Sequence, residues 1–528
     1  MATPTTPTAA AASGAALEVP HRGLITVCAM AATLMQALDG TIANVALPYM
    51  QGTLSATPEQ ITWVLTSYIV AAAIMTSPVG WLAARFGRKR IFLVSVGGFT
   101  AASVLCGAAQ SLEQMVVFRL LQGAFGAALV PLSQSTMLDI YPPARRGSAM
   151  AVWGMGVMLG PILGPTLGGW LTEFYNWRWV FYVNLPVGVL AFLGLSLFMR
   201  EEGRPAARGF DWIGFAVLSL GVGALQLMLD RGESKDWFGS TEIVVEAGLG
   251  VLGLYLFAVH LATAERPFIP PRIFRDRNFL SGCLMMFVVG AILFSTAALL
   301  APYLQTLGGY PVFDSGLLLA PRGVGTMVAM TVAGRLADRA DPRAVMLVGV
   351  AIVAWSLYDM TGWTPDVSRW HLMMVTAAQG FGLGFIFIPL QVVAFATLPP
   401  ELRTDGTALT SLVRNIGSAI GISVTIAVLQ RDTQVLHAEI ASAVSPLNRM
   451  MELPGVARFW DPSTGAGAAL LNEEVTRQAQ IMAYANDFKL LLLLSIPTAV
   501  LVLLMRRPAR PVGTGGGGSG GSAHAALD

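Results

Sequence analysis

The sequence places a carboxylate and a guanidinium inside apolar runs, where ionised groups are rare. Asp39 lies within the run 24–47, and Arg119 lies near the start of the run 113–135. At a helical rise of about 1.5 Å per residue, both charges come out roughly 10–12 Å from the same side. Burial favours the neutral carboxyl and a nearby cation favours the ionised one, so we expect Asp39 to bind and release a proton beside Arg119. A permanent structural ion pair is the alternative.

Two other arginines, Arg322 and Arg414, also fall inside apolar runs. Arg414 lies about 15 Å from the start of its predicted helix, 404–428, at the α-helical rise. It could bind an anionic molecule or hold a neighbouring side chain, and we favour a structural or gating role. Asp230 and Asp359 fall at the ends of their runs, where we expect solvated helix caps rather than proton sites.

The elements that must position these charges are membrane-spanning helices. Hydrophobic residues make up 54% of the sequence and charged residues 12%, which is about half the charged fraction of a soluble protein. The apolar blocks are long enough to cross a hydrocarbon core of about 30 Å. The fourteen predicted spans are residues 24–47, 61–83, 91–109, 113–135, 147–171, 180–199, 211–229, 242–262, 279–303, 314–334, 344–360, 371–393, 404–428 and 488–505.

Composition also excludes some partners and predicts the orientation. A net charge of +2 gives no indication of nucleic-acid binding, and the three cysteines lack a metal-ligand spacing. Loops on the side of the termini hold more than twice as many Lys and Arg residues as the opposite loops. Cytoplasmic loops retain basic residues, so both termini are expected in the cytoplasm. We see no removable signal peptide, because the first twenty residues lack its basic region.

An internal repeat divides the chain. Gln122-Gly123 recurs as Gln379-Gly380, an offset of 257, and Gly80-Trp81-Leu82-Ala83 is echoed by Gly334-Arg335-Leu336-Ala337. Repeated halves with a binding site between them are the usual construction of alternating-access transporters. The predicted divisions are a disordered N-terminus 1–23, a six-helix half 24–199, two additional helices 211–262, a six-helix half 279–505 and a disordered Gly/Ser-rich tail 511–528.

Two glycine-rich motifs resemble signatures of the major facilitator superfamily. The first runs from Gly80 through Gly87 and Arg88 to Arg90. The family has an aspartate in this loop, and this chain has Ala84 at that position. The second copy of the motif, which begins at Gly334, keeps the acid as Asp338. A plain basic loop would explain the charges but not the repeated glycines. The second resembles the antiporter signature, in which glycines let helices approach closely and prolines bend them. It contains Gly160, Pro161, Gly164, Pro165, Gly168 and Gly169.

Further motifs resemble the EmrB/QacA-type fourteen-span drug:proton antiporters, and most closely the EmrB branch. They include Leu38-Asp39 to Pro48, Arg119 to Gly123, Trp177 to Pro186 and the Asp230-Arg231-Gly232 segment. The resemblance covers about residues 24–505. It implies an all-α major facilitator fold in the bacterial inner membrane, with two pseudo-symmetric six-helix halves plus two helices. It also implies efflux of amphipathic drug-like compounds in exchange for protons, without an enzymatic reaction or cofactor.

Two alternative functions stay open at this point. A solute-specific facilitator or symporter on the same fold is disfavoured by the Gly/Pro signature, which points to exporters, and a solute-specific exporter that acts alone is also an alternative. A membrane enzyme or channel is disfavoured by the repeat. Polar or aromatic residues near mid-membrane could contact substrate, although each could instead serve packing. They are Gln36, Asn44, Tyr68, Gln134, Tyr303, Gln391, Arg414 and Asn415.

The EmrB resemblance further implies a periplasmic adaptor and an outer-membrane channel as partners. The segment 431–487 is far longer than a helix connection requires, so we expect it to dock such an adaptor. Within it, residues 472–482 mix charged and apolar residues as an amphipathic surface helix would. A cap that folds over the carrier's own outer mouth is the alternative.

Overall fold

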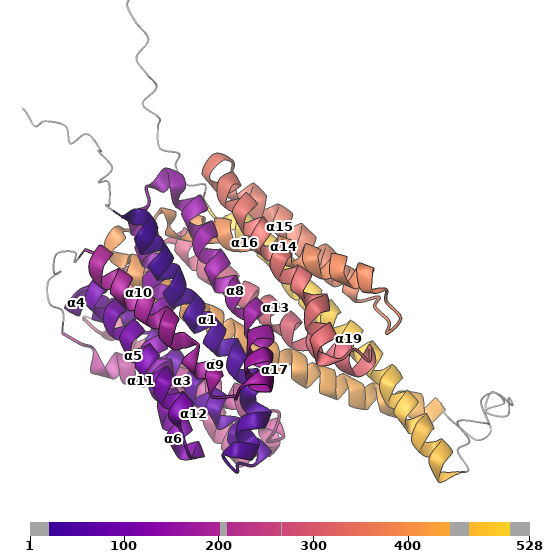
Figure 1. Ribbon diagram of the computed structural model, residues 1–528. Coiled ribbons are helices and arrows are strands. Elements are labelled where there is room, and N and C mark those ends of the chain that lie inside the picture. Colours follow the sequence, from indigo (N-terminus) through magenta and orange to yellow (C-terminus); the bar gives the residue numbers. More distant parts are fainter. Residues whose placement is uncertain (1–20, 201–208, 266, 444–463, 507–528) are drawn as a thin grey trace, which may run out of the picture.

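The computed structural model describes residues 21–200, 209–265, 267–443 and 464–506 (Figure 1). Within these ranges every regular element is a helix. Among the described residues, thirteen helices are long and apolar enough to cross a membrane, and a pair bent by 56° can form a fourteenth span. The predicted all-α fold with fourteen spans is therefore confirmed. The predicted disordered ends, 1–23 and 511–528, lie outside the described residues except for 21–23, and the first helix already begins at Arg22.

The first six spans precede residues 201–208, which lie outside the described residues. They are α1 (Arg22–Thr53), the bent pair α3 (Trp63–Thr76) and α4 (Val79–Phe86), α5 (Arg88–Ala108), α6 (Leu112–Gly126) with α7 (Leu129–Ile140), α8 (Arg146–Phe174), and α9 (Trp179–Tyr182) with α10 (Asn184–Phe198). Two further helices follow, α11 (Trp212–Arg231) and α12 (Thr241–Thr263). Helix α11 packs on α12 and also contacts α3 and α17.

The last six spans begin at Arg277. They are α13 (Arg277–Pro302), prolonged by a π-helical turn (Tyr303–Leu307), α14 (Val312–Arg339), α15 (Pro342–Met360), α16 (Arg369–Ala396), α17 (Arg403–Ala443) and α19 (Gly465–Leu504). Short helices connect some of the spans: α2 (Pro58–Ile61) and 3-10 turns at Pro143–Arg145, Trp237–Gly239, Pro271–Arg275 and Pro400–Leu402.

The two sets of six spans pack in the same pattern. In the first set α1 packs on α8 and α10, and α6 packs on α3 and α5. In the second set α13 packs on α17 and α19, and α16 packs on α14 and α15. Corresponding helices occupy corresponding places in the chain order. We call the two sets the first and second halves.

The halves meet at the end of the bundle that carries the loops rich in arginine, which we call the arginine-rich end. Helix α8 packs on α14, and α17 contacts α4 and α7. Asp139 at the end of α7 binds Arg403 of α17 at 2.5 Å and Arg88 of its own half at 2.7 Å. The opposite end we call the far end.

The described parts of the segment 431–487 are helical, where hydropathy suggested a loop. Helix α17 continues to Ala443, and α19 begins at Gly465, so each is about 60 Å long at the α-helical rise. That is about twice the membrane core. The two helices run side by side away from the rest of the far end, at the lower right of Figure 1. Hydropathy falls where these helices leave the membrane, but their backbone hydrogen bonding continues. The amphipathic stretch 472–482 lies within α19.

Candidate functional site

The acid of α1 and the arginine of α6 form a buried ion pair. An Nη of Arg119 lies 2.7 Å from an Oδ of Asp39, and their side chains are 1% and 0% exposed. Helix α6 starts at the far end, capped by Ser111, whereas α1 starts at the opposite end. The two residues therefore meet at one depth from helices that run in opposite directions.

Amide side chains complete the surroundings of this pair. Gln122, one turn after Arg119, donates from Nε2 to the other Oδ of Asp39 at 2.8 Å, and Asn184 of α10 donates to that same oxygen at 3.3 Å. The carboxylate thus accepts bonds from three side chains. Hydrogen bonds from such donors offset the cost of burying a charge.

The guanidinium is held as firmly as the acid. Its Nε donates to the backbone carbonyl of Val64 at 3.0 Å, and an Nη donates to Gln122 Oε1 at 2.8 Å. It also lies over the Tyr68 ring, 4.2 Å from the centroid, as in a cation–π contact. Arg119 therefore links α1 to α3. A change in the charge of Asp39 would alter the position of Arg119 and so its contacts with both helices.

Sequence reasoning did not assign the amides to the site. Gln122 stood in a recognised motif and Asn184 in another, but neither was predicted to contact Asp39. The available signal was an amide side chain inside an apolar run, which has few partners other than another polar group.

The predicted substrate residues do not gather in one place. Gln134 of α7 and Gln391 of α16 are buried and hydrogen-bonded to each other across the halves at 2.7 Å. Tyr303 is buried in an aromatic cluster with Trp363 and Tyr484. The remaining predicted positions differ in exposure: Tyr68 is buried at the ion pair, Gln36, Arg414 and Asn415 are half-buried, and Asn44 is exposed.

The glycines of α8 form its contact with α1. A Cβ added at Gly160 would lie 2.5 Å from the Ala37 backbone, and one at Gly164 would lie 2.0 Å from the Thr41 hydroxyl. A Cβ at Gly168 would lie 2.8 Å from Ile42, whereas one at Gly169 would meet nothing within 4 Å. The motif thus serves close packing through three glycines. The side chains of Pro161 and Pro165 lie outside the described residues.

A glycine on α6, Gly123, lies close to the Asp39–Arg119 ion pair. A Cβ at Gly123 would lie 2.4 Å from the carbonyl oxygen of Tyr68. Close approach of α6 to α3 at this point lets Arg119 reach the Val64 carbonyl one turn away.

The arginine-rich end is closed by the acid that the second copy of the loop motif retains. Asp338 accepts hydrogen bonds from the backbone N–H groups of Gly147 and Ser148, at 2.8 and 3.1 Å, and from the Ser148 hydroxyl at 2.7 Å. These donors lie at the start of α8, where free N–H groups and the helix dipole favour a carboxylate. Gly334 lies against the Gly147 backbone in the same contact.

The first copy of the motif lacks its acid at Ala84, and an acid from the other half approaches it. The carboxylate of Asp405, in the first turn of α17, lies where a Cβ on Gly80 would be. Gly87 has a φ of 94°, which favours glycine, and starts α5 just before Arg88. Both copies of the loop therefore contact a helix of the opposite half.

The two further arginines lie in the second half. Each is half-buried, and the Nε of each is shielded from solvent without a described partner. An Nη of Arg322 donates to the Leu293 carbonyl of α13 at 2.9 Å. Arg414 lies on α17 and packs against Gly290 of α13.

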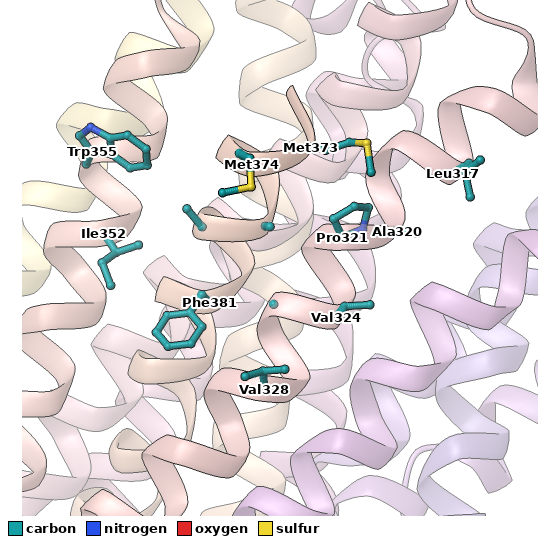
Figure 2. A pocket seen from close by; sticks show the side chains of 13 residues that line it. Leu317, Ala320, Pro321, Val324, Val328, Ile352, Trp355, Met373, Met374 and Phe381 are labelled. Carbon is teal, nitrogen blue, oxygen red and sulfur yellow. The ribbon is translucent and has the colours of Figure 1, made fainter. Parts of the chain in front are cut away.

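A separate apolar groove of about 770 Å³ lies among α14, α15 and α16. Figure 2 shows its aromatic and aliphatic lining, including Trp355, Phe381 and Met374. The lining is apolar throughout, as expected of a surface that contacts lipid chains.

Comparison with known proteins is consistent with this geometry. The sequence model of the Major Facilitator Superfamily matches residues 29–422. The chain belongs to this superfamily. It is 34% identical over 483 residues to the multidrug export protein EmrB of Escherichia coli K12, covering 89% of this chain and 92% of EmrB. It is 32% identical over 486 residues to the fatty acid resistance protein FarB of Neisseria gonorrhoeae, covering 92% and 96%. The predicted resemblance to EmrB-type members of the superfamily is confirmed.

A solved structure supports the fold alone. The human organic anion transporter MFSD10 (TETRAN) superimposes with a TM-score of 0.56 at 14% identity, covering 90% of this chain and 98% of that chain. The chain is therefore a multi-pass membrane protein with the major facilitator fold.

Proposed function

We propose that this chain is a proton-driven multidrug exporter of the inner membrane, with both termini in the cytoplasm. The observation that carries the proposal is the buried Asp39–Arg119 pair with its amide donors. It is the arrangement expected of a carboxylate that exchanges a proton during transport. The EmrB-type relatives support multidrug export, and the arginine-rich loops support the orientation.

In this conformation the arginine-rich end is closed by Asp338, Asp139 and Asp405. With that end in the cytoplasm, the molecule faces outward. Protonation of Asp39 would remove its attraction for Arg119 and convert one oxygen from acceptor to donor. Because α1 packs on α8 through Gly160 and Gly164, a shift of α1 would reach the Asp338 contact at the start of α8. That is the route by which proton binding would change which end is open.

The test is transport by the purified chain in vesicles with an imposed pH gradient. Asp39→Asn should abolish uphill drug movement, because asparagine keeps the shape but cannot ionise. Asp359→Asn is the matched control, since Asp359 lies at the far end of α15 beside His371 and Trp363. Uphill transport by Asp39→Asn at the rate of the control would remove Asp39 from the mechanism.

We further propose that the paired extensions of α17 and α19 bind a periplasmic adaptor of a tripartite pump that also contains an outer-membrane channel. Their length carries them well beyond the membrane core on the side where export would end. Exposed apolar side chains lie along them, among them Val435, Leu470 and Met482. A cap over the carrier's own outer mouth is the competing role.

A further inference from the structure

The middle of the second half carries positive charge that no described acid balances. In the first half, Asp39 neutralises Arg119. Arg322 and Arg414 are half-buried, the Nε of each is shielded from solvent, and neither has a described carboxylate near enough to pair with it. Helix α13, which both of them contact, contains no acidic residue. A cation in such a place is strongly unfavourable unless an anion joins it.

Arg322 occupies the place that Tyr68 occupies in the first half. A Cβ on Gly123 would meet the Tyr68 carbonyl, and a Cβ on Gly380, its counterpart in the repeat, would meet the Arg322 carbonyl at 1.9 Å. Tyr68 lies against the ion pair. Arg322 therefore lies where the second half would have the equivalent of the proton site.

The acid of that site has no equivalent in the second half. Gln379, the counterpart of Gln122, donates from Nε2 to the Thr296 hydroxyl of α13 at 3.5 Å. Gln122 makes the matching contact with the Asp39 carboxylate. The second half thus keeps the glutamine and supplies a guanidinium, but it has a hydroxyl in place of the carboxylate.

Both unpaired arginines approach one turn of α13. Arg322 donates to the Leu293 carbonyl, and the Cγ of Arg414 lies 3.1 Å from where a Cβ on Gly290 would be. Residues three apart share a helix face. Arg322 is about 15 Å from the far end of α14, and Arg414 is about 16 Å from the start of α17, at the helical rise. Both are therefore deep in the membrane core, away from lipid headgroups.

We propose that Arg322 and Arg414 form a binding site for the carboxylate of an amphipathic anionic substrate. The substrate supplies the negative charge that Asp39 supplies in the first half. Its apolar part remains in the membrane core, and its carboxylate accepts charge-assisted hydrogen bonds from the guanidinium groups. This inference rests on the proposed export function and adds the chemical class of a preferred substrate.

The experiment compares two ligands of one skeleton, pyrenebutyrate and pyrenebutyramide, bound to the purified chain in phosphatidylcholine nanodiscs at fixed pH. Empty nanodiscs give the lipid background. We expect the carboxylate to bind about tenfold more tightly than the amide, as a hydrogen bond to a charged group predicts. Arg322→Gln and Arg414→Gln should each reduce this ratio toward one and leave amide binding unchanged. Arg477→Gln, an exposed arginine on α19, is the matched control.

A second variant keeps the arginines in place. Thr296→Asp would provide an internal carboxylate near Gln379, so it should also abolish the preference for pyrenebutyrate. This variant decides the matter if loss of an arginine prevents folding, and its thermal unfolding midpoint reports whether it is folded. A preserved tenfold preference in folded Thr296→Asp would overturn the proposal.

The remaining outcomes separate this inference from the export function. Equal binding of acid and amide by the unaltered chain overturns the anion site and leaves multidrug export standing. If the unaltered chain binds neither pyrenebutyrate nor pyrenebutyramide, both the anion site and the export function are overturned. Loss of the preference when phosphatidylglycerol is added would assign the arginines to a lipid headgroup and also overturn the proposal.

Discussion

At the scale of single residues, the site is an ion pair whose strength depends on amides that the polypeptide brings from other helices. Three side-chain donors face the Asp39 carboxylate. Arg119 is fixed because a backbone carbonyl and an aromatic ring hold its other side. A structural ion pair would have the same contacts, so the decisive experiments change the charge and read out coupling.

Arg119→Ala should impair proton coupling more than Arg119→Lys. The lysine keeps a charge beside Asp39, although it lacks the planar fork that reaches Val64 and Gln122 together. The pH profile of efflux should move in the alanine variant, because the carboxyl loses the cation that favours its ionised form. Efflux assayed across a pH series in vesicles measures both. Equal and mild effects with an unmoved profile would favour the structural interpretation.

At the scale of helices, glycines of α8 pack closely against α1, the helix that carries Asp39. Gly164→Val should slow or uncouple transport, because its Cβ would overlap the Thr41 hydroxyl. Overpacking of this kind costs about 1–3 kcal/mol. Gly169→Val is the matched control on the same helix, since its Cβ would meet nothing within 4 Å. Drug efflux at equal expression is the measurement, and equal efflux from both variants would make the glycine face incidental.

At the scale of the whole molecule, shortening the α17–α19 extension tests whether it binds an adaptor or serves the transport step itself. Replacing residues 436–480 by a short Gly/Ser linker leaves the membrane parts of both helices intact. Docking predicts that adaptor co-purification and whole-cell resistance are lost while vesicle transport by the isolated carrier is preserved. A full-length chain with exposed Met482 and Leu470 changed to Ser controls for loss of apolar contact alone. Lost vesicle transport with the adaptor still bound would favour the cap.

The two halves of the molecule pack in the same way but differ in where their charged side chains lie. The repeat keeps the glycines and glutamines where helices approach closely. Beside the repeated glutamine the first half has the Asp39 carboxylate and the second has the Thr296 hydroxyl, whereas the second copy of the loop motif keeps an acid, Asp338, where the first has Ala84. One half therefore holds the buried ion pair, and the other supplies the carboxylate of the Asp338 contact at the arginine-rich end.

The sequence alone determined the fourteen spans, the family and the depth of Asp39 and Arg119. These depend on transfer free energy and helical rise, which act along one segment at a time. Tertiary structure decided the rest. It brought Gln122 and Asn184 to Asp39, paired Gln134 with Gln391, and continued α17 and α19 as helices beyond the membrane. Hydropathy could not predict these features, because they depend on which helix faces meet side by side.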